Sequence, residues 1–353
     1  MKAWDQGDVV LREARERREA QLEATAAELE AHGIDLDPLP PGHHRHGDEV
    51  HAHDHEHPHA RSEPGEHPVV GVVGAGPVGT TLGLAFSRAG WPVAAVASRD
   101  AGRREAFRRL VPGARGFAEP NALVDDVEIV FLTVPDDAIA AVAGSLRLYA
   151  GQAVVHTSGL LGPEVLAPAM AAGTQAATFH PLVAFADPML AVDALQGATV
   201  AIEGDEGLAA HLAELAEAIG AVPVRLPPGS KATYHAAAVL SAGGVVSLLD
   251  AIVELGRTLE LDETATLAIF LPLVEQTAAN VRALGVARAL TGPTVRGDAG
   301  TVTAHLDAIA RSAPGVEAVY RALVERSVAI AEDRRALAPD AAQRLRTALA
   351  RPG

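Results

Sequence analysis

A glycine-rich run limits the fold of this chain more than any other feature. The segment "VVGVVGAGPVGTTLGLAF" places Gly74, Gly76 and Gly79 in a GxGxxG array, after a Val-rich strand candidate and before a helix of small residues. In this context Gly74 suits a tight turn, Gly76 the close approach of a pyrophosphate, and Gly79 close packing of helix on strand. The alternative is a structural turn without a ligand. We predict a dinucleotide-binding βαβ unit, which the next strand, "PVAAVAS", completes.

The order of the remaining segments predicts two domains after an N-terminal tail. From Val69, short apolar runs alternate with helical patterns, which is typical of a parallel sheet. Beyond Pro228 helical periodicity continues, broken at Gly285, "TGPTVRGDAG" and "SAPG". The predicted fold class is α/β plus all-α, with a Rossmann-type parallel sheet domain followed by a helical second domain. The predicted divisions are an N-terminal helix in 1–40, a disordered His-rich linker in 41–67, the NADP-binding domain in 68–228 and the helical domain in 229–349.

Composition narrows the classes of function. The formal net charge is -16, with 45 acidic and 29 basic residues, which disfavours nucleic acids and anionic membranes as partners. The chain has no cysteine, so disulfides, thiolate catalysis and Cys-ligated metals are excluded. The charged N-terminus has no apolar signal core, and we expect a cytoplasmic protein. The apolar run 236–249 is shorter than the roughly 20 residues of a membrane span and is predicted to be a buried helix.

The second strand ends in Ser98, Arg99 and Asp100, which bears on the choice of cofactor. An acidic residue at the strand end would hold the ribose hydroxyls of NAD, whereas a hydroxyl with a guanidinium suits a ribose 2′-phosphate. We therefore expect NADP(H), with NAD as the less favoured alternative. Arg103 and Arg104 either assist this contact or belong to the solvated start of the next helix.

Other expected cofactor contacts follow from the rule that the carboxyl ends of parallel strands face the ligand. For Pro135 and Asp136 a strand end with a helix N-cap is a compatible alternative. These predicted contacts lie in the glycine turn and after two later strands: Pro77, Val78, Thr133, Val134, Pro135, Thr157 and Ser158. His156 is expected to shape the same pocket.

Lys231 and His235 are candidate catalytic residues because a spacing of four places them on one helix face. Hydride transfer to a carbonyl leaves negative charge on oxygen, which Lys231 can stabilise and either residue can protonate. The alternative is an exposed lysine with a packing histidine. Tyr234 faces about 100° away and is expected outside the site. His180 ends a short strand, where it either reaches the nicotinamide cleft as a third catalytic candidate or hydrogen-bonds its own turn.

Four segments carry a family resemblance: "HTSGLLGPEVL", "FHPLVAFADP", "KATYHAAAVLSAGG" and "LTGPTVRGDAGTVTAHLDAI". Over residues 69–340 the chain resembles Rossmann-like proteins that carry the domain of unknown function 2520. These are similar to 6-phosphogluconate, β-hydroxyacid, prephenate, pyrroline-5-carboxylate and ketopantoate enzymes. The resemblance implies a homodimeric NADP-dependent reductase of a small 2-oxo acid, with ketopantoate, and hence pantothenate synthesis, as the best guess. An imine reductase of the pyrroline-5-carboxylate type and a prephenate-type dehydrogenase are the alternatives.

The expected substrate contacts lie further along the chain. Arg296 offers a planar fork to a substrate carboxylate and Asp298 follows in the same loop, although an internal pair of the two is equally open. The resemblance adds Ser241. Where related proteins commonly have Ser-Asn, this chain has Ser241-Ala242-Gly243-Gly244 and so lacks a side-chain amide that could hold substrate. His305 either faces the same cleft or lies on a helix surface.

The His-rich segment suggests a second kind of chemistry. Imidazoles spaced by one residue bind Zn²⁺ or Ni²⁺, but a Pro- and Gly-rich segment lacks the fixed geometry of a catalytic site. We expect adventitious binding and no catalytic metal. The eight residues are His43, His44, His46, His51, His53, His55, His57 and His59. A protein that binds NADP without turnover and a metal-handling protein therefore remain as alternatives to the reductase.

Overall fold

The computed structural model describes residues 43–46, 49–52, 67–170, 173–227 and 229–351. It divides into two compact units, Met1–Ala238 and Val239–Gly353, which are described separately. In the predicted linker it contains two short antiparallel strands that we did not predict, β1 (His43–His46) and β2 (Glu49–Ala52). The helix predicted in residues 1–40 lies outside the described residues, as does the remainder of the linker up to residue 66.

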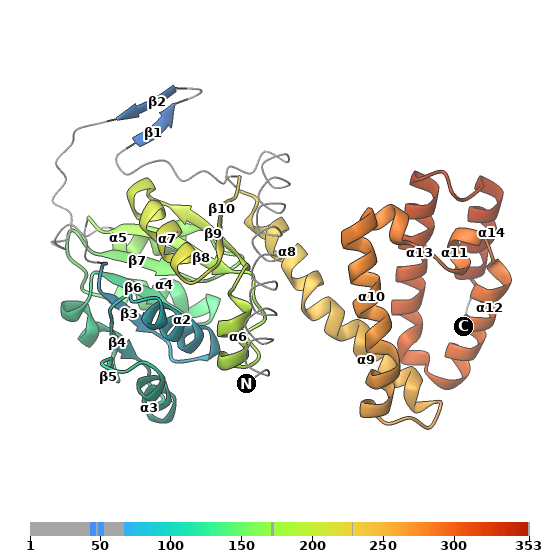
Figure 1. Cartoon of the computed structure of the whole chain (residues 1–353), viewed down its shortest axis with the longest axis horizontal. Coiled ribbons are helices and arrows are strands. Elements are labelled where there is room, and N and C mark those ends of the chain that lie inside the picture. The colour runs from blue at the N-terminus through green and yellow to red at the C-terminus, as the bar shows by residue number, and fades with distance from the viewer. Residues whose placement is uncertain (1–42, 47–48, 53–66, 171–172, 228, 352–353) are drawn as a thin grey trace, which may run out of the picture. The chain divides into compact units, whose positions relative to one another are not determined.

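The first unit is built on an eight-stranded sheet of order β10-β9-β8-β7-β6-β3-β4-β5 (Figure 1). Its central strands are Val- and Ala-rich and buried, as expected for a sheet covered on both faces. Neighbouring strands are parallel except β8 and β9, an antiparallel pair that we did not predict. The strands are β3 (Val70–Val73), β4 (Val93–Ala97), β5 (Arg115–Phe117), β6 (Ile129–Leu132), β7 (Ala153–His156), β8 (Gln175–Pro181), β9 (Thr199–Gly204) and β10 (Val222–Arg225).

Helices cover both faces of this sheet. On one face Phe86, Phe131 and Phe179 pack against one another with ring centroids 5.1 to 5.9 Å apart. Leu132 follows Phe131 in its strand and therefore points to the other face, where it belongs to a second core with the helical residue Ile139. The helices are α2 (Pro77–Arg88), α3 (Ala101–Leu110), α4 (Asp136–Ser145), α5 (Ala167–Met170), α6 (Pro188–Ala194) and α7 (Glu206–Ala218), with 3-10 turns η1 (Pro120–Asp126) and η2 (Pro163–Leu166).

The strand order fixes where a ligand can bind. β3 lies between β4 and β6, so the chain runs to one side of β3 through β4 and β5 and then crosses to the other side. Such a switch point opens a crevice outside the carboxyl ends of the strands. The glycine array follows β3 directly and therefore lies in this crevice.

The second unit is helical, which confirms the predicted fold class. Its core contains Val302, Leu306, Val328 and Leu345. Gly285, where we predicted a break, has φ 73° inside α10. The helices are α9 (Gly243–Arg257), α10 (Glu263–Ala289), α11 (Pro293–Arg296), α12 (Ala299–Ser312), α13 (Glu317–Asp333) and α14 (Pro339–Leu349), with a 3-10 turn η3 (Pro314–Val316). The connecting helix α8 (Lys231–Ser241) begins in the first unit and ends in the second.

The predicted burial of the apolar run 236–249 is wrong. Leu240 is 72% exposed and Val246 67% exposed. Apolar composition alone does not place a helix in a core, and this chain leaves most of the run uncovered. The stretch Lys231–Arg257 is long and apolar enough to cross a membrane by length and composition, which for a single helix is weak evidence.

Candidate functional site

The three glycines of the array occupy three different environments. Gly74 has φ 110°, and a Cβ there would lie 2.6 Å from the carbonyl oxygen of Thr133. At Gly79 a Cβ would overlap the carbonyl oxygen of Gly74, so the start of α2 packs tightly on the turn. At Gly76 a Cβ would meet nothing within 4 Å. The open side of the loop at Gly76 is the place where a ligand can approach the backbone.

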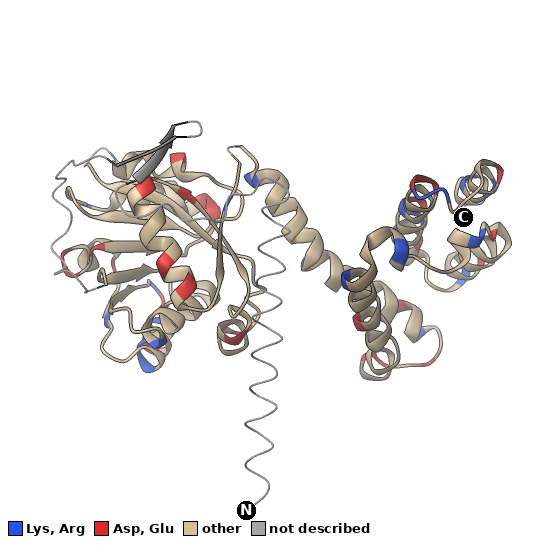
Figure 2. Cartoon of the chain, turned by 45° about the horizontal axis from the view of Figure 1, so that its top comes forward, with Lys and Arg blue, Asp and Glu red and all other residues tan. Residues whose placement is uncertain are grey.

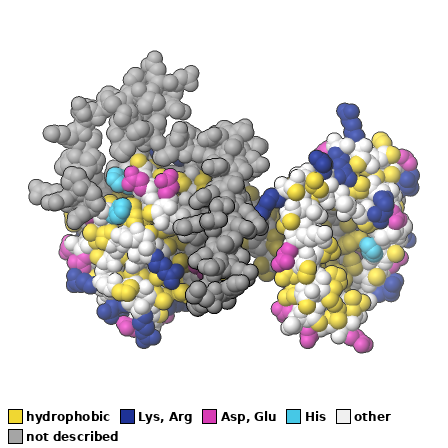
Figure 3. Space-filling view, viewed as in Figure 1, with side chains coloured by type: hydrophobic (Ala, Val, Ile, Leu, Met, Phe, Trp, Pro, Cys, Tyr) yellow, Lys and Arg dark blue, Asp and Glu magenta, His cyan; other side chains and the backbone are white. Residues whose placement is uncertain are grey.

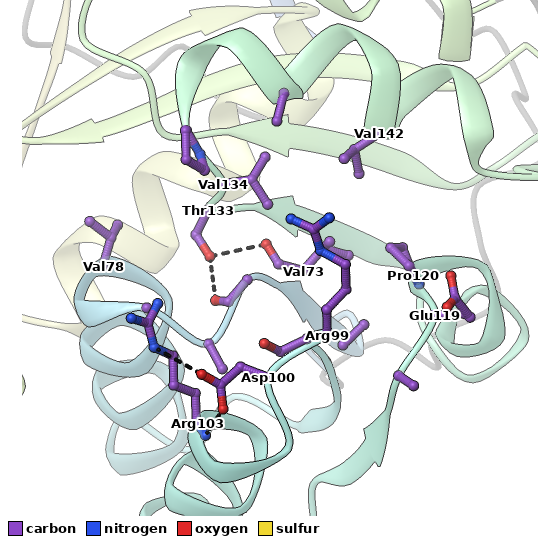
Figure 4. Close-up of a pocket in the computed structure, with 18 of the residues that line it drawn as sticks. Val73, Val78, Arg99, Asp100, Arg103, Glu119, Pro120, Thr133, Val134 and Val142 are labelled. Carbon is purple, nitrogen blue, oxygen red and sulfur yellow. Dashed lines mark hydrogen bonds and ion pairs between the residues drawn. The ribbon is translucent and has the colours of Figure 1, made fainter.

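This open side forms part of a cavity of about 790 Å³ at the carboxyl ends of β3, β4 and β6 (Figure 4). Gly79 lies behind the loop, and Thr157 and Ser158 follow β7 without lining the cavity. The predicted cofactor residues that do line it are Gly74, Gly76, Pro77, Val78, Ser98, Arg99, Thr133, Val134 and Pro135. The structure thus brings nine of the twelve predicted residues together around one cavity.

Thr133 fastens the glycine loop to β6. Its hydroxyl lies 3.1 Å from the carbonyl oxygen of Val73 and 2.7 Å from that of Gly74, and it donates to both (Figure 4). The threonine hydroxyl is thereby used within the protein. Thr133 therefore contributes to the cavity by holding the glycine loop in position.

The arginines after β4 have different surroundings. Asp100 caps α3 by accepting from Arg103 N at 3.0 Å, which lowers the pKa of its carboxyl. Arg104 donates to the Ser98 carbonyl at 2.6 Å. Arg99 lines the cavity and makes no hydrogen bond or ion pair with the part of the chain that the structure describes. Basic residues gather on α3 beside this edge (Figure 2). Arg103 and Arg104 both use their guanidinium groups within the protein, whereas that of Arg99 has no partner among the described residues.

Lys231 begins α8 in the first unit, and its side chain is buried. The amine donates to the carbonyl oxygen of Ser158 at 3.0 Å, and its Nζ lies 3.9 Å from Oε2 of Glu203. Burial lowers the pKa of Lys231, while Glu203, Glu164 and Asp136 act in the opposite direction. The lysine that we expected at a helix start is therefore not a solvated surface residue.

Ser158 connects Lys231 to the edge of the cofactor cavity. Its hydroxyl donates to Asp136 at 2.8 Å and accepts from the backbone N–H groups of Leu160 and Leu161. Asp136 directly follows Pro135, which lines the cavity. Asp136 thus helps to fix Ser158, whose carbonyl holds the lysine. The segment that carries Asp136 is the one that bounds the nicotinamide side in a Rossmann crevice.

His156 is fully buried behind Ser158. Nδ1 accepts from the backbone N–H of Ser158, so Nε2 carries the proton and donates to the Gly162 carbonyl at 3.0 Å. Burial lowers the pKa of His156 to about 4. A neutral imidazole with both nitrogens used is a structural support, and His156 does not itself line the cavity.

His180 lies near the end of β8, two residues after Thr178, the last residue that pairs with β7. Its Nδ1 donates to the carbonyl oxygen of Thr157 at 3.0 Å, which leaves Nε2 as an acceptor, and burial lowers its pKa. The His235 ring lies 5.8 Å away edge-on, and Gly159 approaches so closely that a Cβ there would lie 2.7 Å from His180 Cε1. The structure therefore brings His180 and His235 together at the end of β8, and α8 also carries Lys231.

Tyr234 is closer to this cluster than we predicted. Its ring meets His180 edge-on at 5.9 Å, and burial raises the pKa of its hydroxyl to about 12. Tyr234 OH and His235 Nδ1 are both shielded from solvent and have no hydrogen-bond partner among the described residues. Buried polar atoms are nearly always paired in proteins, and these two are exceptions among the described residues.

The expected substrate residues belong to the second unit. Asp298 caps α12 by accepting from Thr301 N and Thr301 Oγ1, which lowers its pKa. Its carboxylate therefore has a structural use, and Arg296 ends the short helix α11. His305 hydrogen-bonds Tyr320 at 2.7 Å within the same unit. Ser241 is the last residue of α8.

Sequence reasoning missed Glu203. A charged residue in the apolar strand "ATVAIEG" was the available signal.

A metal site is not found among the described residues, where no group of three or more potential ligands comes together. Four of the eight histidines, His53 to His59, lie outside the described residues, and the side chains of β1 and β2 are not described. The predicted adventitious binding stays a prediction.

Comparisons with known proteins agree with this architecture. The model of a Rossmann-like domain matches residues 59–181, and that of the domain of unknown function DUF2520 matches residues 198–327. Comparison with curated protein sequences found no match.

Similar solved structures span almost their whole length on this chain. A Bacteroides fragilis protein assigned as an NADP oxidoreductase is 22% identical, with a TM-score of 0.62, covering 74% of this chain and 98% of that one. Protein TM1727 from Thermotoga maritima is 26% identical, with a TM-score of 0.57, covering 75% and 99%. A reductive aminase from Aspergillus terreus, solved with NADPH and ethyl levulinate, is 18% identical, with a TM-score of 0.57, covering 80% and 99%. The chain therefore contains a Rossmann-like domain followed by the domain of unknown function 2520.

Proposed function

We propose that the protein is an NADP-dependent reductase that adds hydride to a small carbonyl or imine compound. The observation that carries the proposal is the adjacency of two features in one unit: the cavity at the glycine loop, and a buried Lys231 whose carbonyl partner is tied to Asp136 beside that cavity. A nucleotide site next to a buried proton donor is the pairing that a reductase needs.

The residues of the cavity fit NADP(H). The open backbone at Gly76 and the uncapped N–H groups at the start of α2 suit the pyrophosphate. Arg99 suits the ribose 2′-phosphate, because its guanidinium has no other described partner. Asp100 also lines the cavity, where one of its carboxylate oxygens caps α3. When bound, the reduced cofactor supplies the hydride.

The side chains at α8 supply the remaining chemistry. As the substrate carbon gains hydride, its oxygen or nitrogen gains a proton, and the Lys231 ammonium is placed to donate it and later regain one from solvent. His180 Nε2, as an acceptor, is available to orient the substrate, with the His235 ring beside it. The Thr157 carbonyl fixes the orientation of His180.

The substrate class has two candidates. A small 2-oxo acid, with ketopantoate as the best guess, relies on the family resemblance and on Arg296 as the carboxylate ligand. An imine is supported by the likeness to the reductive aminase and by the acidic groups Glu203, Glu164 and Asp136 around Lys231, which disfavour a substrate carboxylate there. A prephenate-type dehydrogenase and binding without turnover have no specific support in the structure.

A screen of NADPH oxidation tests the proposal. The panel contains ketopantoate, pyrroline-5-carboxylate and the carboxylate-free 1-pyrroline, each with the wild type and Lys231→Ala. Turnover of ketopantoate alone supports the oxo acid, and turnover of 1-pyrroline supports the imine. Failure to turn over any carbonyl or imine compound would remove the reductase assignment.

A homodimer and a cytoplasmic location remain part of the proposal. The second unit exposes many apolar side chains on α9 and α10 (Figure 3), including Val246, Ile269 and Leu273. An exposed apolar surface of this kind is typical of an interface. Light scattering after size exclusion should give twice the chain mass of 36.4 kDa. A monomer at micromolar concentration would contradict the dimer.

A further inference from the structure

Glu203 is the one charged residue of β9, a strand of otherwise uncharged and mostly apolar residues. In β9 it lies opposite Thr178 of β8, which in turn is aligned with His156 of β7. Side chains aligned in this way share one face of the sheet. The backbone N–H of Glu203 donates to Thr178 Oγ1 at 3.2 Å, so the residue is held in register where it faces Lys231.

The pair formed by Glu203 and Lys231 is largely shielded from solvent. The two side chains are 17% and 7% exposed, and Lys231 Nζ lies 3.9 Å from Glu203 Oε2. The Ser158 carbonyl is the nearer acceptor at 3.0 Å, but it carries no charge. A buried ammonium needs a nearby anion to offset its lost hydration, and among the described residues Glu203 is the carboxylate within 4 Å of it.

The remaining groups around the amine do not replace this carboxylate. Asp136 accepts from the Ser158 hydroxyl, and both Asp136 and Glu164 are exposed, so solvent screens them. Burial lowers the pKa of Lys231, and Glu203 is the largest influence that raises it. The other titratable groups that face the site come from η2, α4, β7, β8 and α8: Glu164, Asp136, His156, His180 and His235.

We propose that Glu203 is a positioning residue that keeps Lys231 protonated and holds its ammonium at the Ser158 carbonyl. The inference rests on the proposed function, in which this ammonium protonates the reduced substrate. Activity then falls as pH rises through the pKa of Lys231, because a neutral amine is a far weaker proton donor. Without the Glu203 carboxylate this fall moves to lower pH.

The lysine content of the chain makes a direct test possible. Lys2 and Lys231 are the only lysines in the sequence, so selective ¹³C labelling gives two ε-carbon NMR signals, which Lys231→Arg assigns. We expect Lys231 to titrate below the ordinary 10.5 in the wild type, and lower still in Glu203→Gln by about one pH unit or more. Glu203→Asp should recover part of this difference, and Glu206→Gln, an exposed neighbour, should match the wild type. Equal titration in the wild type and a folded Glu203→Gln variant would overturn the proposal.

The pH profile of NADPH oxidation separates the two proposals. In Glu203→Gln the alkaline limb of kcat should move by the same amount as the NMR titration, while NADPH binding stays unchanged. A moved NMR titration with an unmoved limb would show that Lys231 is not the proton donor, which defeats the proposed mechanism but leaves the pair intact. If Glu203→Gln does not fold by circular dichroism, Glu203→Asp provides the comparison, because its longer gap to Nζ should also lower the Lys231 titration.

Discussion

The cofactor cavity and the Lys231 cluster lie at the same edge of one sheet but are built from different parts of the chain. The cavity is lined largely by backbone and apolar side chains, with Gly74, Gly76 and Thr133 at its base. The cluster consists of titratable side chains, Lys231, Glu203 and His180, held by backbone carbonyls. Backbone groups bind a phosphate at any ordinary pH, whereas the cluster depends on where each proton lies.

This difference divides the expected effects of substitution. Changes in the glycine loop act on fold and cofactor affinity, while changes in the cluster act on turnover and on its pH dependence. Four variants test this division, in order of decreasing expected effect.

Gly79→Ala should have the largest effect. Its Cβ would overlap the Gly74 carbonyl, so the loop and α2 must separate, and we expect no measurable NADPH binding together with a lower melting temperature. Gly76→Ala is the matched control, because its Cβ meets no protein atom and should weaken NADPH binding without changing the melting temperature. Fluorescence titration and thermal unfolding measure both. Equal behaviour of the two variants would break the account of the loop.

Lys231→Ala should lower kcat by about 10²-fold to 10⁴-fold, because a positioned proton donor accelerates a reaction by that factor. The affinity for NADPH should stay within about twofold of the wild type, since the cavity has no contact from this side chain. Stopped-flow NADPH oxidation and equilibrium titration separate the two. A variant that loses cofactor binding along with turnover would show that the cavity and cluster are not distinct.

His156→Asn should change how stability depends on pH. The folded pKa of His156 is about 4 and the ordinary value is 6.5, so the unfolded chain binds more protons between them. In the wild type this group removes about 3 kcal/mol of unfolding free energy as pH falls from 6.5 to 4, and the variant should lack that loss. Urea unfolding measures it, followed in a Trp4→Phe background by the fluorescence of Trp91, which is buried in the first unit. Parallel pH profiles for both proteins would contradict a neutral, buried His156.

Arg99→Ala should have the smallest effect of the four. Losing the guanidinium should weaken NADPH binding by about tenfold and leave NADH binding unchanged, because NADH has no 2′-phosphate. Arg109→Ala, at the exposed end of α3, should leave both affinities unchanged. Equal losses for NADPH and NADH would place Arg99 elsewhere on the cofactor.

The two regions also differ in how far the sequence predicts them. The glycine loop is contiguous, so its spacing and flanking strand were enough to predict the turn. The rule that the carboxyl ends of parallel strands face the ligand added the predicted cavity residues after β4 and β6. The cluster joins α8 to β9 and to the segment after β7, and no local pattern places Glu203 beside Lys231. Helix geometry predicted that Lys231 and His235 share a face, but it did not predict that the Tyr234 ring also meets His180.

The helical part shows a second limit. The breaks near Gly285 and before α12 follow from glycine and proline, which act locally. Burial of the run 236–249 was predicted wrongly, because an apolar pattern shows that a helix has an apolar face but not what covers it. The antiparallel pairing of β8 and β9 depends on the path of the chain through α6, which strand composition does not encode.

Deuterium transfer tests the central claim most directly. NADPH with deuterium at both hydrogen positions of the nicotinamide C4 is incubated with each carbonyl and imine compound of the panel. The products are then analysed by mass spectrometry. The account predicts that the wild type places deuterium at the reduced carbon. It predicts that Lys231→Ala forms this product about 10²-fold to 10⁴-fold more slowly. Tight NADPH binding with no deuterated product from any compound, or equal transfer by both proteins, would contradict it.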